Sequence, residues 1–356
     1  YIQGVKLKIL FHSFQLGERG TEVMLYNYAK YSKEILGHEP VIVSTHTRPT
    51  PGLKIFKDFE VVLYPEIFDS NNRNEHLRQR LEKIVDQTKA DAIFQAKGGE
   101  IDNTTPRNCK SWIHGIFRMD QPHGDVYSAV CKYIVDKHKG KHPHVFPIIE
   151  NPKINGNLRE ELGIPSDGFV FGRHGGIDTF QIKWAHKTIE RALSKRSDLY
   201  FVFLNTEMFI DHPRVKFLPM TIDVDRKFKF INSCDAMIHS RLDGEIFSQA
   251  IAEFSICNKP IVTWSGLIKW NNQIIPQPGY DTGHHAVLKE DGLYYHGPQD
   301  LENILTDITH SFVNTKDWDV YKDKYSPERV MRQFDNVFIK KLNNWNVDFL
   351  EDTESE

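Results

Sequence analysis

Short apolar segments rich in Val, Ile and Phe alternate with longer amphipathic segments along the first part of the chain. Residues 6–11 (KLKILF) and 40–44 (PVIVS) are typical of buried strands. Between them, apolar side chains recur at helical spacing from 21 to 36, which predicts a helix, and Gly37 follows as a C-terminal cap would. A strand, a helix and a second strand in this order form a βαβ unit, so the pattern predicts a parallel sheet.

The alternation continues as far as residue 149 and then stops. The expected strands of this part are 60–63, 91–95, 110–113 and 145–149, and the expected helices are 74–89 and 126–137. Asn151-Pro152 then opens a polar segment containing Gly, which is typical of a linker or hinge between domains.

A second alternation begins after this linker. Its expected strands are 169–172, 199–204, 215–218, 235–239, 260–264 and 292–295, and its expected helices are 182–193, 223–233, 245–257, 298–312 and 327–342. We therefore expect an α/β protein with two doubly wound, Rossmann-like domains, 1–150 and 151–325, and a ligand at the carboxyl ends of their strands. Residues 326–356 are expected to add a C-terminal helix, which can cross back to the first domain, and an acidic tail.

The composition excludes several classes of protein. The 356 residues are 40% hydrophobic and 26% charged, which supplies enough apolar material for two cores and excludes a disordered chain. Lys and Arg (45) nearly balance Asp and Glu (48), so the formal net charge is −3 and no nucleic-acid partner is expected. No apolar run has the length of a membrane span, and residues 1–5 do not resemble the start of a signal peptide.

The cysteines and histidines indicate neither disulfides nor a metal site. Four cysteines are scattered without a C-x-x-C pair, which is typical of reduced thiols in a cytoplasmic protein. None of the 17 histidines has zinc-ligand spacing to a carboxylate or a cysteine. Asp223-x-Asp225 could bind a divalent metal, but it opens an expected helix, where Asp serves as a cap. We therefore expect no metal and no cofactor.

The most informative segment is 239–253 (HSRLDGEIFSQAIAE), which contains two glutamates. Their spacing corresponds to about two helical turns, so a helix starting at 245 would bring Glu245 and Glu253 to one groove. Free amides at such a helix start bind anions. The residues in that position are Ile246, Phe247 and Ser248. The alternative is that both glutamates are only solvated charges.

This segment resembles the Glu-x7-Glu motif of glycosyltransferase family 4, a family of retaining enzymes with the GT-B fold. The family has Phe-Gly after its first glutamate, whereas this chain has Phe247-Ser248. The resemblance implies that Glu245 holds sugar hydroxyls near the reacting carbon and that Glu253 holds the ribose hydroxyls of the donor.

Two segments of the first domain are similar to the same family. Residues 20–22 (GTE) resemble its Gly-Gly-x-Glu loop, in which Gly17 and Gly20 would let the backbone approach the donor phosphates; an ordinary strand-to-helix turn is the alternative. Residues 112–115 (WIHG) resemble the family's segment at the cleft floor, which implies that His114 contacts the donor sugar near its anomeric carbon. A lone histidine is otherwise more often structural.

The second domain carries further matches. Residues 171–173 (FGR) resemble the strand end whose arginine pairs with the donor diphosphate, a role that suits the planar guanidinium of Arg173. Lys183 is the candidate for the family's nearby lysine, although its spacing from Arg173 is longer than usual. The segment that ends at Met220 lies where the family recognises the base, largely through backbone groups.

The resemblance implies transfer of a hexose from a nucleoside-diphosphate sugar, of GDP-mannose or UDP-glucose type, to an acceptor hydroxyl with retention of configuration, in glycan synthesis. The acceptor would be a glycan, a lipid or a protein-linked sugar, and a homodimer is compatible with the sequence. Arg173 and Lys183 would stabilise the leaving diphosphate. A non-catalytic nucleotide-sugar-binding protein and a sugar-nucleotide epimerase of the same fold remain alternatives. No G-x-G-x-x-G motif follows a strand, which disfavours a dinucleotide oxidoreductase.

Overall fold

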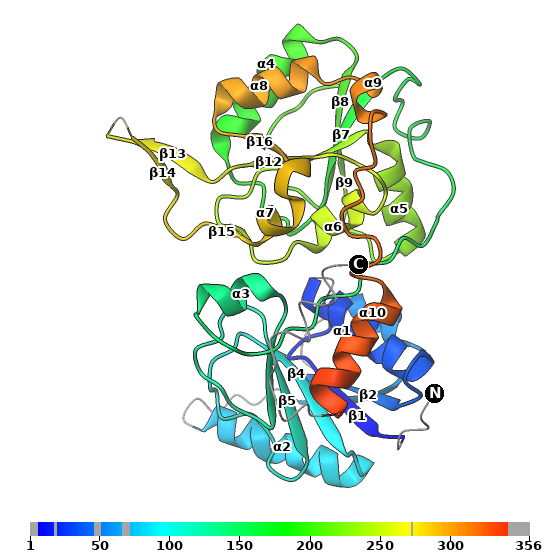
Figure 1. Ribbon diagram of the computed structural model, residues 1–356. Coiled ribbons are helices and arrows are strands. Elements are labelled where there is room, and N and C mark those ends of the chain that lie inside the picture. The colour runs from blue at the N-terminus through cyan, green and yellow to red at the C-terminus, as the bar shows by residue number, and fades with distance from the viewer. Residues whose placement is uncertain (1–5, 18–19, 46–50, 66–71, 272, 341–356) are drawn as a thin grey trace. The chain divides into compact units, whose positions relative to one another are not determined.

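The computed structural model describes residues 6–17, 20–45, 51–65, 72–271 and 273–340 (Figure 1). The expected acidic tail and the last two residues of the expected helix 327–342 lie outside these ranges. The chain forms two compact units, which we call the first unit (Tyr1–Ile148 and Lys324–Glu356) and the second unit (Ile149–Asp323). Each unit has its own six-stranded parallel sheet.

The first unit is built on a sheet with the strand order β3-β2-β1-β4-β5-β6. Its strands are β1 (Lys8–His12), β2 (Glu39–Thr45), β3 (Glu60–Tyr64), β4 (Ala92–Lys97), β5 (Lys110–Gly115) and β6 (Val126–Ala129). Its helical segments are α1 (Gly20–Glu34), η1 (Pro51–Phe56), α2 (Arg73–Thr88), α3 (Lys132–Lys137), α10 (Pro327–Phe334) and η3 (Asp335–Ile339). Because β1 pairs with both β2 and β4, this is the Rossmann order, with its switch point between β1 and β4.

Successive side chains of the central strands in the first unit face different helices. Leu10 of β1 belongs to an apolar cluster with Leu81 of α2. Phe11, the next residue, points to the opposite face, where its ring centroid lies 6.3 Å from that of Phe334 of α10. Phe94 of β4 meets the same ring at 5.7 Å. The C-terminal segment therefore completes the core of the first unit.

The second unit repeats this plan with the strand order β16-β12-β10-β7-β8-β9. The strands of this sheet are β7 (Phe169–Arg173), β8 (Leu199–Leu204), β9 (Val215–Leu218), β10 (Ala236–His239), β12 (Ile261–Trp264) and β16 (Leu293–Tyr295). The helical segments are α4 (Lys183–Lys195), α5 (Val224–Ser233), α6 (Gln249–Ser255), α7 (Gly283–Leu288), η2 (Lys289–Asp291), α8 (Pro298–Asp307) and α9 (His310–Val313). Because β7 pairs with both β8 and β10, the switch point lies between β7 and β10.

The core of the second unit is rich in aromatic side chains. Phe171 of β7 and Phe201 of β8 stack with their ring centroids 5.5 Å apart. Ile189 of α4 and Leu301 of α8 belong to the same buried cluster, so these two helices cover one face of the sheet.

Four short strands in the second unit were not predicted from the sequence. β13 (Leu267–Trp270) and β14 (Gln273–Pro276) form an antiparallel hairpin, which Figure 1 shows extending from the sheet. β11 (Gly244–Glu245) pairs with β15 (Asp281–Thr282). Neither pair shows the long apolar alternation on which a sequence-based prediction depends.

The structure corrects two predictions in the first unit. The segment 126–137 is not one helix, because its first four residues form β6 beside β5 and only Lys132–Lys137 is helical. The segment 145–149 is not a strand; the chain there adds only a single bridge, between Ala129 and His144, to the end of β6.

Two predictions in the second unit are also wrong in their boundaries. The expected helix 245–257 begins only at Gln249, because Gly244 and Glu245 pair with β15. The expected helix 298–312 divides into α8 and α9, because Thr309 is extended and its hydroxyl caps the second helix.

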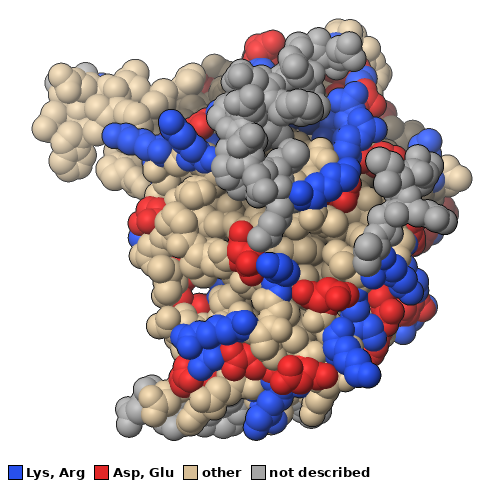
Figure 2. All heavy atoms as spheres, turned by 60° about the horizontal axis from the view of Figure 1, so that its bottom comes forward, with Lys and Arg blue, Asp and Glu red and all other residues tan. Residues whose placement is uncertain are grey.

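Acidic and basic side chains are interspersed on the face of the molecule that Figure 2 shows. That face carries no continuous patch of one sign of charge. None of the helices in the described ranges combines the length and the hydrophobicity that a bilayer span requires.

We expect Phe334→Ala to destabilise the first unit by about 3–5 kcal/mol, because it empties a fully buried site between β1, β4 and α1. Urea unfolding followed by tryptophan fluorescence measures this loss. Phe312→Ala, at a side chain that is 39% exposed, is the matched control and should cost less than about 1 kcal/mol. Equal stability of the two variants would show that α10 does not complete this core.

Candidate functional site

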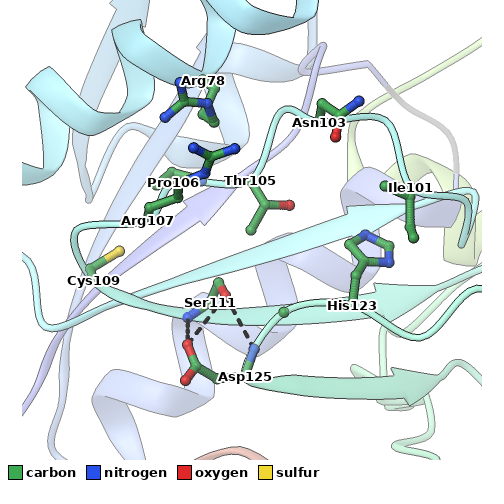
Figure 3. Close-up of a pocket in the computed structure, with 11 residues that line it drawn as sticks. Arg78, Ile101, Asn103, Thr105, Pro106, Arg107, Cys109, Ser111, His123 and Asp125 are labelled. Atoms are coloured by element: carbon green, nitrogen blue, oxygen red, sulfur yellow. Dashed lines mark hydrogen bonds between the residues drawn. The ribbon is translucent and has the colours of Figure 1, made fainter.

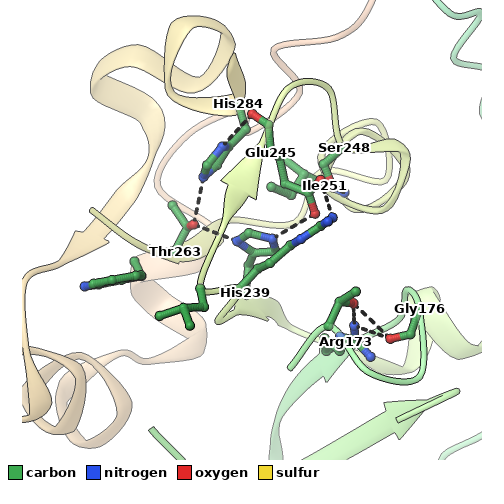
Figure 4. Close-up of polar contacts among 12 residues, drawn as sticks. Arg173, Gly176, His239, Glu245, Ser248, Ile251, Thr263 and His284 are labelled. Atoms are coloured by element: carbon green, nitrogen blue, oxygen red, sulfur yellow. Dashed lines mark hydrogen bonds and ion pairs between the residues drawn. The ribbon is translucent and has the colours of Figure 1, made fainter. Parts of the chain in front are cut away.

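The carboxyl ends of β7 and β10 lie side by side at the switch point of the second unit. β7 ends at Arg173 and β10 ends at His239, and the pairing register sets Gly172 opposite Met237. An open parallel sheet binds its ligands outside the carboxyl ends of the strands at such a point. Figure 4 shows the polar residues that gather there.

Arg173 is a buried cation held by the loops around it. Its two terminal nitrogens donate hydrogen bonds to Asn205 O (3.2 Å), Thr206 Oγ1 (2.5 Å), Gly176 O (2.9 Å) and Thr179 Oγ1. Burial lowers the pKa of Arg173 to about 10, while nearby Glu245 acts in the opposite direction. The guanidinium therefore remains a fixed and partly desolvated positive charge at neutral pH.

Glu245 lies between a guanidinium and an imidazole. Its Oε2 accepts a hydrogen bond from Arg241 at 2.9 Å, and its Oε1 lies 3.3 Å from Nε2 of His239. The preceding Gly244 has a φ of 67°, and a Cβ there would lie 2.1 Å from the carbonyl oxygen of Asp281. Only glycine permits the close β11–β15 pairing that presents Glu245 in this position.

Arg241 was not singled out from the sequence. Its side chain is 32% exposed, and its Nε is buried without a hydrogen-bond partner in the described part of the chain. One terminal nitrogen binds Glu245, so the guanidinium has further donors for a ligand. A basic residue just after a strand at the switch point is the signal that could have identified it.

A chain of polar contacts continues behind Glu245 (Figure 4). Nδ1 of His239 lies 2.9 Å from the hydroxyl of Thr263, and that hydroxyl lies 3.3 Å from Nε2 of His284. Nδ1 of His284 in turn lies 3.5 Å from the backbone carbonyl oxygen of Glu245. The contacts therefore lead from the carboxylate of Glu245 through His239, Thr263 and His284 back to the backbone carbonyl of Glu245.

The start of α6 differs from the expected anion site. Ser248 is the N-cap of α6, and its hydroxyl accepts a hydrogen bond from the amide of Ile251 at 3.4 Å. Ile246 and Phe247 precede the cap, so the three expected amides do not form the first turn of the helix. Glu245 lies in β11, and the two glutamates of the motif therefore do not share one helix.

Glu253 on α6 is bound within the protein. Its Oε1 accepts hydrogen bonds from Lys227 at 2.6 Å and from Gln249 at 3.3 Å, and its Oε2 lies 3.0 Å from Nε2 of His174. Burial raises the pKa of Glu253, but Lys227 and His174 outweigh burial and lower it to about 2. A ribose would therefore have to compete with three protein partners for this carboxylate.

The other residues expected in the site lie at the ends of separate elements. Lys183 is the exposed first residue of α4 and has no ion-pair partner in the described ranges. Met220 follows β9 and is 49% exposed. Gly17 and Gly20 belong to the first unit and flank residues 18–19, which lie outside the described residues; α1 begins at Gly20.

His114 is a core residue of the first unit. Its side chain is 0% exposed, and its ring centroid lies 5.5 Å from that of Phe94 and 6.1 Å from that of Phe338. Nδ1 lies 2.9 Å from the hydroxyl of Ser128, and burial lowers the pKa of His114 to about 3. Aromatic rings enclose the imidazole, and its Nε2 has no hydrogen-bond partner in the described part of the chain, so the contact with a donor sugar stays a prediction.

Polar residues also gather at the switch point of the first unit, between β1 and β4. Nε2 of His12 lies 2.8 Å from the hydroxyl of Tyr64, and Nζ of Lys97 donates to Asp102 at 2.6 Å and to Thr104 at 2.8 Å. Burial and the charge of Lys97 lower the pKa of His12 to about 3. This buried cluster was not predicted from the sequence, because its members come from separate strands.

A surface pocket of about 400 Å³ lies elsewhere in the first unit (Figure 3). It is lined by residues that precede β5 and β6, including Cys109 and Asp125, so it lies at the amino ends of these strands. Asp125 accepts a hydrogen bond from the amide of Ser111, and Arg78 binds Glu82 at 2.5 Å. The side chains of Asp125 and Arg78 thus already have partners within the protein. The pocket also lies at the amino ends of the strands, whereas a Rossmann-like unit binds its ligands at the carboxyl ends.

The structure assigns Asp223 to a helix cap. Its carboxylate accepts hydrogen bonds from the amides of Asp225 at 2.9 Å and Arg226 at 3.4 Å, which confirms the cap interpretation. Within the described ranges, no three His, Cys, Asp or Glu side chains are grouped in a way that could hold a metal ion.

No protein-family model matches the chain, and no curated protein matches it in sequence. Solved structures do match it. A glycosyltransferase from Rickettsia africae is 14% identical with a TM-score of 0.62, covering 98% of both chains. Anabaena HepE in complex with UDP-glucose is 14% identical with a TM-score of 0.63, covering 98% of this chain and 100% of that one.

A third similar structure is a putative UDP-N-acetylglucosamine 2-epimerase from Listeria monocytogenes. It is 10% identical, has a TM-score of 0.59, and covers 95% of this chain and 98% of its own. At such identities the likeness shows the fold. The chain has the GT-B fold, with two Rossmann-like units, as the sequence predicts.

The Glu253 cluster should make the stability of the second unit sensitive to acid. Because the pKa of Glu253 is lowered from 4.5 to about 2 by folding, the unfolded chain binds more protons between these values, and stability falls as the pH drops through that window. Urea unfolding between pH 5 and pH 2 should show a smaller loss in Glu253→Gln than in the wild type. Glu160→Gln, at an exposed glutamate, should keep the wild-type slope. The same slope in all three proteins would contradict the role of Glu253.

Proposed function

We propose that the chain is a glycosyltransferase that moves a hexose from a nucleoside-diphosphate sugar to an acceptor hydroxyl. The observation that carries this proposal is the grouping of Arg173, Arg241 and Glu245 at the switch point of the second unit. Two guanidinium groups suit a diphosphate, and a carboxylate accepts hydrogen bonds from sugar hydroxyls. The fold's likeness to solved glycosyltransferases supports the same function.

The difficult step is the cleavage of the bond between the anomeric carbon and the phosphate oxygen. Negative charge then grows on the leaving diphosphate, while positive charge grows on the sugar ring. The loops accept all four hydrogens of the terminal nitrogens of Arg173, so this residue supplies its fixed positive charge and its Nε–H, whereas Arg241 has donors left for the phosphate oxygens. Such preorganised donors stabilise the transition state without reorganising during the reaction. Lys183 supplies a further cation if the loop before α4 brings it to the diphosphate.

Glu245 is assigned to the sugar. Each of its oxygens already has one protein partner, His239 or Arg241, which leaves a second lone pair on each oxygen for a sugar hydroxyl. We assign retention of configuration to the departing phosphate, which accepts the proton of the acceptor hydroxyl on the same face of the sugar.

For the donor we propose a UDP-hexose of the UDP-glucose type ahead of GDP-mannose. The complexes of Anabaena HepE with UDP and with UDP-glucose support this choice. The acceptor is proposed as a glycan, a lipid or a protein-linked sugar, and the reaction as metal-independent.

A sugar-nucleotide epimerase is the second candidate, since a putative epimerase from Listeria monocytogenes has a similar fold. An epimerase would change the configuration of the sugar of UDP-N-acetylglucosamine, and any release of UDP and free sugar would use water in place of an acceptor hydroxyl. Product analysis by NMR with the two donors separates the two functions.

The wild-type protein should bind UDP-glucose in calorimetry and slowly release UDP from it, with water as the acceptor. Arg173→Ala and Arg241→Ala should each lower the rate of UDP release by about 10²–10³, because each removes a donor to the leaving group. Arg226→Ala removes an arginine whose ion pair with Glu161 is exposed, and this control should keep the wild-type rate. Wild-type rates in both site variants would show that the diphosphate does not bind at this position.

Chelation should leave the reaction intact. Because two guanidinium groups are assigned to the diphosphate, UDP release in the presence of excess EDTA should equal that in untreated protein. The matched measurement adds Mn²⁺ after the chelator. Loss of activity with EDTA and its recovery with Mn²⁺ would show that a metal carries out the role assigned here to the arginines.

A further inference from the structure

We propose that Thr263 and His284 act with His239 as a positioning relay that sets the orientation of the Glu245 carboxylate. The relay deepens the proposed function and rests on it, because Glu245 is the group assigned to the sugar. None of the three residues belongs to the Glu-x7-Glu motif itself.

The relay joins three separate elements of the second unit. His239 ends β10, Thr263 is in β12, and His284 is in α7. Their exposed fractions are 5%, 0% and 1%, so water does not compete for their polar atoms. Figure 4 shows the two rings on either side of the Thr263 hydroxyl, with the Glu245 carboxylate beyond His239.

The contacts fix where the protons lie. The carboxylate of Glu245 is an acceptor, so Nε2 of His239 must carry a proton to donate to it. The Thr263 hydroxyl has one proton and two neighbouring ring nitrogens, so it donates to one of them and accepts from the other.

The surroundings place the proton of His284 on Nε2. The Tyr280 hydroxyl donates to the carbonyl of Trp264 at 2.6 Å, so at 3.4 Å from Nε2 of His284 it can only accept from that nitrogen. Burial lowers the pKa of His284 well below its ordinary value, and the rings of His239 and His285 act in the same direction, so the ring carries a single proton. Nδ1 of His284 lies 3.5 Å from the carbonyl oxygen of Glu245, which is the longest contact of the group.

In the completed chain of contacts, Nε2 of His284 donates to Thr263, Thr263 donates to Nδ1 of His239, and Nε2 of His239 donates to Glu245. The ring of His239 is then held at both nitrogens, and the carboxylate is held by His239 and Arg241. If the Thr263 hydroxyl is lost, the imidazole keeps only its contact with the carboxylate and can rotate with it. The relay thus affects the sugar-binding group and leaves the guanidinium of Arg173 in place.

The decisive kinetic experiment compares Thr263→Val with Thr263→Ser. Thr263→Val keeps the shape but removes the hydroxyl, and it should lower kcat for UDP release from UDP-glucose by about tenfold to hundredfold, the equivalent of one hydrogen bond to a charged group. The affinity for UDP, which lacks the hexose, should stay at the wild-type value. Thr263→Ser should restore kcat. Thr188→Val, at another buried threonine of the same unit, is the matched control and should keep the wild-type kcat.

Three results would overturn the relay. They are a wild-type kcat in Thr263→Val, a serine variant as slow as the valine variant, and a loss of UDP affinity that accompanies the loss of kcat. The third would indicate a general loss of structure in the second unit.

A second measurement tests the relay without any donor. In ¹⁵N-labelled wild-type protein, NMR of the imidazole nitrogens should show the proton of His284 at Nε2 and a proton at Nε2 of His239. A His284 ring protonated only at Nδ1 would contradict the relay. If the wild type neither binds UDP nor releases it from a donor, the proposed function fails, while this NMR result still decides whether the relay exists.

Discussion

The pairing of β7 with β10 is the constraint on which the candidate site depends. The chain builds the sheet of the second unit from β7 in one direction and then returns to β10 on its other side, so consecutive halves of the unit meet at this pair. Arg173 and His239 end the two strands, so the parallel pairing alone brings both residues to the same edge of the sheet. The charged side chains at this edge then determine which ligand it suits. Arg173 and Arg241 face one carboxylate, which leaves a surplus of positive charge for an anionic ligand.

Burial and backbone geometry divide the motif residues into different roles. Glu245 is presented by a glycine turn and remains partly exposed, whereas Glu253 is buried against Lys227 and His174. A carboxylate of the second kind stabilises the packing of α5 and α6. Glu245 can therefore contact a ligand directly, whereas the carboxylate of Glu253 already contacts other protein groups.

The parallel sheets and most element boundaries could be predicted from the sequence, because buried strands and amphipathic helices have distinct periods. The start of α6 could not, since it depends on the pairing of Gly244 with Asp281, which lies far along the chain. The environment of His114 was hidden for a similar reason, as Phe338 of the C-terminal segment helps to cover it. Thr263 and His284 carry no local motif, and only the packing of separate elements brings them to Glu245. Such long-range pairings are not encoded in any single window of sequence.

A crystal structure of the protein with UDP-glucose tests the central claim most directly. The account predicts that the diphosphate oxygens lie within hydrogen-bonding distance of the guanidinium groups of Arg173 and Arg241, with the hexose hydroxyls at Glu245. A diphosphate bound away from the carboxyl ends of β7 and β10, or a hexose that does not contact Glu245, would contradict it.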